Sequence, residues 1–399
     1  MPGPRRCFAT PKALRQLNPG LLCALLRKFP EYLEARQLDL PADPLPDTLD
    51  YEAIQAACMG RDVPVELDDV LSHVSILGTA AGWERIQAEA RAQKKELTVT
   101  AAKLTFADRA MQAWLWDWPH NITLLEESYA RARIHARSSY VYFPPLMDVR
   151  ALYQSPTAAK LAEMRQELDT YFVCEGLGKG TSLVRFEFEK EIWFLIRYPG
   201  RWKRQMAIDE GGGVQRLTFK PQEYDAVVYH KEYGDLRMNT LRVSDRTRYR
   251  ILFGRSLLNS INVFAPAARA ISLEPLKGEC LPLFHCEDIP GLAEIAPVEV
   301  AYHTAADQGR LVIWRADKQT TLLSTNRLAP LLVPSDTDTV RHAVFRYRLR
   351  NKTKYEALTV HQGNTLTYER DGDSVVMEAW LRSRNFVKND LVSSGTPSG

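Results

Sequence analysis

The cations of residues 345–354 have a spacing that could serve ligand binding. The segment is Phe-Arg-Tyr-Arg-Leu-Arg-Asn-Lys-Thr-Lys, and no acidic residue occurs between positions 341 and 354. Alternate side chains of a β-strand lie on one face, so five cations would form a stripe about 26 Å long opposite three apolar side chains. Such a stripe favours a polyanion and spans several phosphates of a nucleic acid. We therefore expect phosphate contacts from Arg346, Arg348, Arg350, Lys352 and Lys354.

Two further groups of cations could belong to the same surface. The segment Arg201-Trp202-Lys203-Arg204 follows a proline and a glycine and is expected in a turn. Its tryptophan could stack on an unpaired base while the cations hold the backbone. The other group surrounds a predicted helix near 245–257 and consists of Arg242, Arg246, Arg248, Arg250 and Arg255. For all three groups, the alternative is a solvated face paired with acids elsewhere in the fold.

A magnesium-dependent nuclease is the enzymatic alternative. Such sites hold the metal with carboxylates at strand ends and polarise a water molecule. The candidates are Asp225, Glu187, Glu189 and Lys231. The position two before Lys231 is Tyr229 rather than an acid, and the alternation of both glutamates with apolar residues also predicts a solvated strand face. The prediction therefore leans towards a protein without catalytic activity.

Other motifs depart from the spacing that their chemistry needs. The segment 176–181, Gly-Leu-Gly-Lys-Gly-Thr, suggests a phosphate loop, but a glycine separates lysine from threonine and a strand is expected to follow. Cys280, His285 and Cys286 offer three soft ligands where a structural zinc site needs four. The hydrolase patterns G-x-S-x-G and H-E-x-x-H do not occur. We predict no metal and no cofactor.

Two kinds of secondary structure must position these residues. Residues 10–150 have apolar side chains at three- and four-residue steps, which predicts helices near 66–77, 82–95, 105–117 and 121–137. From about residue 170 the period is two, and glycine-containing turns near 211–213, 233–235 and 362–364 predict hairpins. Strands that cluster without alternating helices argue against a doubly wound parallel sheet. The predicted fold is α+β, with a helical N-terminal region followed by a mostly antiparallel, strand-rich α+β domain.

The domain prediction has three parts. Residues 1–155 form an α-helical domain expected to contact a partner protein, 156–390 form the strand-rich domain with the basic face, and 391–399 form a disordered tail. Pro144-Pro145 and Ser155-Pro156 mark the junction. Three tryptophans at spacing two cannot all share one helical face, so at least one of Trp114, Trp116 and Trp118 is expected at the surface. A protein-interaction scaffold is therefore a third hypothesis.

The overall charge conceals strong local differences. The 399 residues carry 52 basic and 49 acidic side chains, and 25% charged residues excludes a collagen-like or wholly disordered chain. The net charge of +3 combines eleven acids and two bases in residues 31–69 with six uncompensated bases in residues 341–354. The acidic segment could compete with nucleic acid for the basic face or bind a basic partner.

The cysteine pattern and the apolar runs bear on the compartment. Six irregularly spaced cysteines without a C-x-x-C pair predict reduced thiols, and no apolar run has the length of a signal peptide or of a membrane span. We expect a cytoplasmic protein that does not enter a membrane. The leading hypothesis is a non-enzymatic nucleic-acid-binding or regulatory subunit of a larger bacterial assembly, such as a phage-defence system. The sequence leaves the oligomeric state open.

Overall fold

The chain divides into a helical unit, Met1–Ile134, and a strand-rich unit, His135–Gly399. A computed structural model describes residues 5–388 except 61, 93–94, 96, 98–103, 119–123, 136–137, 188–189, 209–212, 265–269, 278–279, 306–308, 317–333 and 369–373. The predicted α+β class is confirmed. The boundary precedes the predicted junction because β1, Ser139–Phe143, is a central strand of the second unit's sheet. The predicted disordered tail lies outside the described residues.

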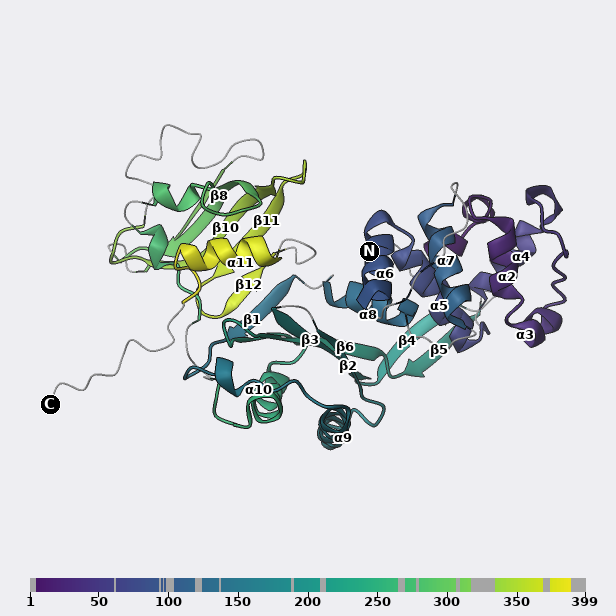
Figure 1. Cartoon of the computed structure of the whole chain (residues 1–399), viewed down its shortest axis with the longest axis horizontal. Coiled ribbons are helices and arrows are strands. Elements are labelled where there is room, and N and C mark those ends of the chain that lie inside the picture. Colours follow the sequence, from purple (N-terminus) through teal and green to yellow (C-terminus); the bar gives the residue numbers. More distant parts are fainter. Residues whose placement is uncertain are drawn as a thin grey trace. The chain divides into compact units, whose positions relative to one another are not determined.

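The first unit is built from short helices around one apolar core (Figure 1). The chain breaks between α1 and α2, because Asn18 caps α2 by accepting a hydrogen bond from the Leu21 amide and Pro19 occupies the first helical position. The described helices are α1 Pro11–Leu14, α2 Pro19–Leu26, α3 Pro30–Ala35, α4 Tyr51–Met59, α5 Val65–Leu77, α6 Ala80–Ala92, α7 Phe106–Asp117 and α8 Leu124–His135.

The second unit contains a ten-stranded sheet in the order β2-β3-β6-β7-β1-β12-β11-β10-β8-β9. All of its recorded strand pairs are antiparallel, as predicted. Besides β1, the strands of this sheet are β2 Ser182–Glu187, β3 Glu191–Pro199, β6 Gln222–His230, β7 Leu236–Asn239, β8 Leu292–His303, β9 Leu311–Arg315, β10 Thr339–Leu349, β11 Glu356–His361 and β12 Thr365–Thr367.

Helices of the second unit cover apolar parts of this sheet (Figure 1). Helices α9, Ala158–Cys174, and α10, Val243–Leu258, share a core with β3 and β6. Helix α11, Ser374–Ser383, places Trp380 5.3 Å from the ring of Phe345 on β10. Phe345 and the side chains on its face of β10 therefore pack in the core beneath α11. The arginines of β10 lie on the opposite face.

A separate two-stranded ribbon connects β3 to β6 (Figure 1). It consists of β4, Lys203–Ile208, and β5, Val214–Phe219, which confirms the hairpin predicted around the glycine run. The amide of Gly200 donates to the carbonyl of Pro221 at 2.6 Å and closes the base of the ribbon. Among the described residues, no helix has the length and apolar character of a membrane span.

Candidate nucleic-acid interface

Strand β10 presents the predicted alternation only in part. Phe345 and Tyr347 are fully buried, and Arg346 and Arg348 lie half-buried on the opposite face. The strand ends at Leu349, and β11 pairs back onto it from residue 356. The chain must therefore reverse between these positions. The expected five-cation strand face is corrected to two strand arginines, followed by three cations in the reversing segment: Arg350, Lys352 and Lys354.

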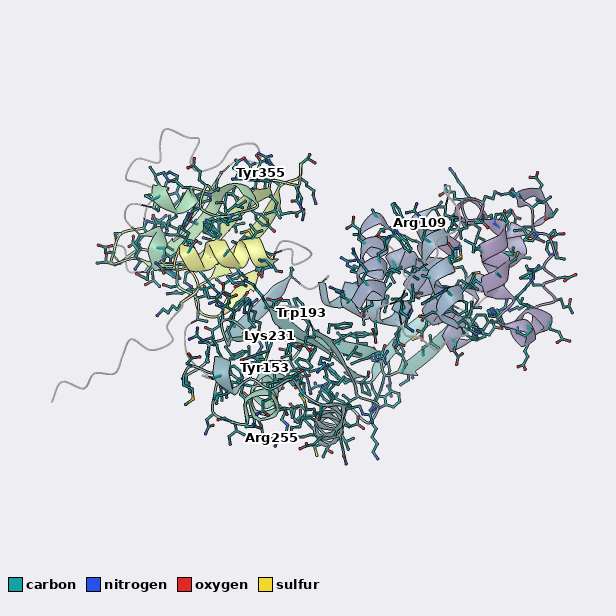
Figure 2. The ribbon with its side chains drawn as sticks, in the orientation of Figure 1. Arg109, Tyr153, Trp193, Lys231, Arg255 and Tyr355 are labelled. Carbon is teal, nitrogen blue, oxygen red and sulfur yellow. The ribbon has the colours of Figure 1, made fainter. Side chains whose placement is uncertain are left out.

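The strand arginines have partners within the fold. The guanidinium carbons of Arg346 and Arg348 lie 4.5 and 5.5 Å from the ring centroid of Tyr355, which Figure 2 labels. The Tyr355 hydroxyl donates to Glu294 at 2.6 Å, and the same carboxylate lies 3.7 Å from Arg348. The Lys354 ammonium lies 3.4 Å from Glu356. A phosphate at this surface would compete with acids and an aromatic ring already in place.

The β4–β5 ribbon carries cations with fewer acidic partners. Its described residues, 201–208 and 213–220, contain five lysines and arginines and no acid. Lys203 lies 3.7 Å from Glu223 at the ribbon's base, whereas Arg201, Arg204 and Arg216 form no ion pair with any described residue. All three of these arginines are exposed. Their charge is therefore available to an external anion.

Strand register assigns the ribbon's side chains to two faces. Directly opposite residues share a face in an antiparallel pair, and Arg204 is opposite Thr218 while Met206 is opposite Arg216. We call this side the Trp202 face, because Trp202 continues it at the base, where the Lys220 ammonium lies 5.3 Å from the indole centroid. Its members are Trp202, Arg204, Met206, Ile208, Val214, Arg216, Thr218 and Lys220.

The Trp202 face is unusually apolar for an exposed surface. The exposed fractions are 65% for Trp202, 60% for Met206, and 68% for both Ile208 and Val214. Exposed apolar side chains in a contiguous group mark interaction sites more often than isolated ones do. The face therefore combines cations at its base with an apolar end, and a matching ligand needs both anionic and apolar surfaces.

The glycine loop near residue 178 does not offer its amides to a phosphate. The carboxylate of Asp169 on α9 accepts hydrogen bonds from the amides of Gly180 and Thr181 at 3.0 and 2.8 Å. The Lys220 ammonium donates to the carbonyl of Leu177 in the same loop. These contacts tie the loop to α9 and to the ribbon's base, as a connection into β2 requires.

The residues of the nuclease alternative are only partly brought together. Glu187 lies 2.9 Å from Lys231. Asp225 is opposite Ile196 in the register and accepts hydrogen bonds from Tyr249 at 2.7 Å and Leu241 at 2.9 Å. It lies four positions along the strands from the level of Glu187, about 13 Å. Glu189 is outside the described residues, and the described part of the chain contains no three-residue metal cluster, at 280–286 or elsewhere.

Three of the five arginines around α10 are engaged by acids, while Arg246 donates to the Thr240 hydroxyl. Arg248 and Arg255 both contact Glu167 of α9, and Arg242 lies 2.7 Å from Asp245. Burial lowers the pKa of Arg250. This group packs α10 against α9, which is the structural alternative considered for it from the sequence.

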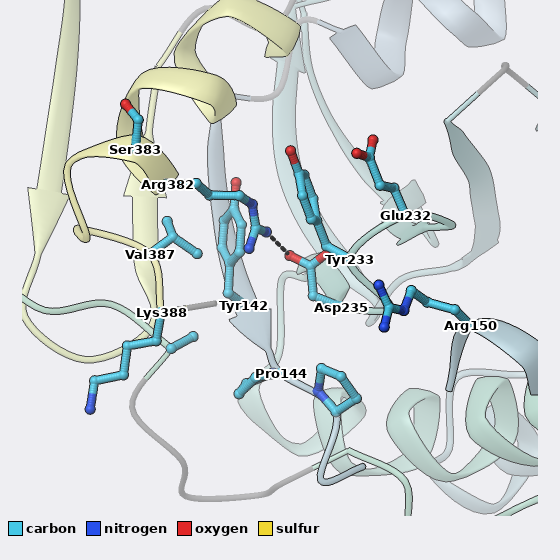
Figure 3. A pocket seen from close by; sticks show the side chains of 12 residues that line it. Tyr142, Pro144, Arg150, Glu232, Tyr233, Asp235, Arg382, Ser383, Val387 and Lys388 are labelled. Carbon is cyan, nitrogen blue, oxygen red and sulfur yellow. Dashed lines mark hydrogen bonds and ion pairs between the residues drawn. The ribbon is translucent and has the colours of Figure 1, made fainter. Parts of the chain in front are cut away.

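A buried charge cluster was missed by the sequence reasoning. Arg237 of β7 is fully buried and lies 2.8 Å from Glu191, 3.1 Å from Asp235 and 3.3 Å from Glu378. Arg382 of α11 also contacts Asp235, at 3.0 Å (Figure 3). Burial by itself would raise the pKa of Asp235, but the two arginines outweigh it and lower the pKa to about 2. The sequence feature that could have indicated this cluster is the single arginine within the apolar segment 236–238.

A cavity of about 320 Å³ adjoins this cluster (Figure 3). Its walls include Arg382 and Asp235, which neutralise each other, and Tyr233, whose ring centroid lies 3.6 Å from the Arg382 guanidinium carbon. Glu232 pairs with Lys190 at 3.0 Å. Arg150, which pairs with Asp148, and Lys388 also line the cavity. Most of the charges around the cavity are therefore engaged within the fold, and its lining does not identify a ligand.

The tryptophans of the first unit divide as the spacing predicts. Trp114 is 9% exposed and stacks on Phe29, whereas Trp118 is 44% exposed and lies 4.8 Å from Trp114. The surface position of one tryptophan is confirmed. A partner protein at this position stays a prediction.

Neither a protein-family model nor a curated protein matches this chain. A function must therefore be argued from geometry and charge. The ribbon joins exposed arginines that form no ion pair within the described part of the chain to exposed aromatic and apolar side chains.

Proposed function

We propose that this protein is a non-enzymatic nucleic-acid-binding protein whose strand-rich unit holds the phosphate backbone through the β4–β5 ribbon. The observation that carries the proposal is that three exposed arginines of the ribbon form no ion pair with any described residue: Arg201, Arg204 and Arg216. Cations that lack internal partners gain most from a polyanion, because binding releases the counterions that otherwise screen them.

The remaining basic residues have a smaller role in this proposal. The cations at 350–354 follow β10 in a turn, and we expect them to add phosphate contacts if the ligand extends that far. Arg346 and Arg348 already contact Tyr355, so they contribute less. The nuclease alternative receives no support from the separation of Asp225 and Glu187.

The cellular setting remains a prediction. A cytoplasmic location and membership of a bacterial assembly such as a phage-defence system follow from composition and sequence pattern alone. In that setting the helical unit, with Trp118 exposed, would contact the partner protein.

Charge reversal on the full-length chain tests the proposal. We expect the double variant Arg201→Glu, Arg204→Glu to lose most of its affinity for a fluorescein-labelled polynucleotide in fluorescence anisotropy at low salt, because two phosphate contacts become repulsive. The matched control, Arg165→Glu with Lys28→Glu, makes the same change in net charge at exposed positions outside the ribbon. Equal loss in both variants, or no binding by the unmodified protein, would contradict the proposal.

A second pair of substitutions separates the ribbon from β10. The double variant Arg348→Glu, Arg350→Glu alters the segment that sequence spacing favoured. We expect it to weaken binding less than the ribbon variant does, since Arg348 already has Glu294 as a partner.

A further inference from the structure

We infer that the Trp202 face binds single-stranded nucleic acid, with the indole of Trp202 stacked on an unpaired base. This inference rests on the proposed function and specifies its ligand. Its basis is that apolar and cationic side chains lie together on one face: Arg204 lies between the exposed Trp202 and Met206 along the chain, and Arg216 is directly opposite Met206.

A single strand has the matching surfaces. Its bases are apolar on their faces and its backbone carries one negative charge per nucleotide, so both kinds of side chain find partners along one line. A duplex hides its base faces in the stack and presents mainly phosphates and groove edges to a protein. Against a duplex, Trp202, Met206 and Ile208 would remain largely without an apolar partner.

The spacing of side chains along the ribbon also favours a single-stranded ligand. The apolar positions Trp202 and Met206 are four residues apart along the strand, about 13 Å, whereas neighbouring bases within a duplex strand are separated by about 3.4 Å. Neighbouring bases that contact Trp202 and Met206 must therefore be drawn apart from one another. A single strand permits this separation without breaking base pairs.

The surroundings of Trp202 suit a base rather than a buried packing role. Its side chain is 65% exposed, compared with 44% for Trp118 and 36% for Trp314. The Lys220 ammonium lies 5.3 Å from its ring centroid, Arg201 and Lys203 flank it in sequence, and Arg204 is the next residue on its face of the strand. A stacked base would thus have cations beside it for the adjoining phosphates.

An acidic protein segment is the competing occupant of a cationic and apolar face. The aromatic ring between cations favours nucleic acid, since planar stacking is available from every base. Poly-L-glutamate supplies the charge without the bases and therefore serves as the discriminating competitor.

The test compares Trp202→Ala and Trp202→Phe in the full-length protein. We measure anisotropy with oligo-dT and with a duplex of the same length, and we expect the single strand to bind more tightly to the unmodified protein. The alanine variant should lose about tenfold in single-strand affinity, within the range for one stacked base, while its salt dependence and its duplex affinity stay unchanged. The phenylalanine variant should retain most of the affinity, because a ring remains.

The outcomes separate this inference from the proposed function. If the unmodified protein binds no polynucleotide at low salt, the proposed function fails and the inference with it. If duplex and single strand bind equally, or Trp202→Ala affects neither, nucleic-acid binding survives and the single-strand inference is overturned. Displacement of oligo-dT by poly-L-glutamate at equal charge concentration would assign the face to acidic protein and would also overturn the inference.

Discussion

The protonation equilibrium of His230 in the second unit is shifted by its buried surroundings. His230 is 4% exposed, and burial together with the nearby Arg237 lowers its pKa to about 4. Its Nδ1 lies 3.2 Å from the amide nitrogen of Tyr233, an arrangement in which the neutral ring accepts the hydrogen bond. Protonation would place a second cation beside Arg237, and the carboxylates of Asp235, Glu191 and Glu378 offset this cost only in part. The folded protein therefore favours the neutral imidazole.

This state of His230 predicts a pH-dependent stability. The folded pKa lies below the ordinary value of 6.5, so the unfolded chain takes up the proton first and the stabilising contribution is lost as pH falls from about 6.5 towards 4. We expect this residue to account for about 2 kcal/mol of lost unfolding free energy between pH 7 and pH 5. Urea denaturation of the unmodified protein and of His230→Gln at both pH values measures it. An equal pH dependence in the two proteins would contradict this account.

At the scale of elements, the ribbon is attached to the sheet by a short base. Pro199 is opposite Gln222 in the β3–β6 register, and the Gly200 amide bonds to the Pro221 carbonyl. The chain can therefore leave β3, form the ribbon and return into β6 without a break in the β3–β6 hydrogen-bond ladder. An isolated two-stranded ribbon contributes little stability, so its apolar residues are better explained by a ligand than by folding.

Removal of the ribbon tests that explanation. We expect replacement of residues 201–220 by Asn-Gly, a favoured hairpin turn, to lower the unfolding free energy by no more than about 3 kcal/mol, mainly through loss of the Lys220 contact with the Leu177 carbonyl. Nucleic-acid binding should be lost, because Arg201, Arg204 and Trp202 are removed together. Denaturation and anisotropy on the same preparation give both results. A deletion variant that still binds would place the interface elsewhere.

Helices and strands could be predicted from the sequence where neighbouring residues determine where an element begins or turns. Asn18-Pro19 determined the start of α2, and the glycine run marked the β4–β5 hairpin. The length of the cation stripe was not predictable, because the end of β10 depends on where β11 pairs back onto it. The cluster around Arg237 was equally hidden, since Glu191 and Glu378 lie 46 and 141 positions away in the sequence. The alternation of apolar and polar residues within one strand does not indicate which residues far away in the sequence will contact it.

For the whole molecule, the two charged regions of the sequence have different outcomes. Part of the acidic segment 31–69 serves the helical unit itself: Asp68 pairs with Arg5, Asp62 pairs with Arg36, and Asp50 caps α4. The cations of the ribbon have fewer such internal partners, with Arg201 and Arg204 as the clearest cases. The small net charge of the chain therefore conceals an acidic segment used in part for folding and a basic ribbon available to a ligand.

The salt dependence of oligonucleotide binding tests the central claim most directly. If the ribbon neutralises three to five phosphates, the logarithm of the association constant should fall linearly with the logarithm of salt concentration, with a slope of about −2 to −3.5 for a single strand. The double variant Arg201→Gln, Arg204→Gln should bind more weakly with a slope about 1.4 less negative. A slope near zero, or the same slope in both proteins, would contradict the claim that these ribbon arginines hold the backbone.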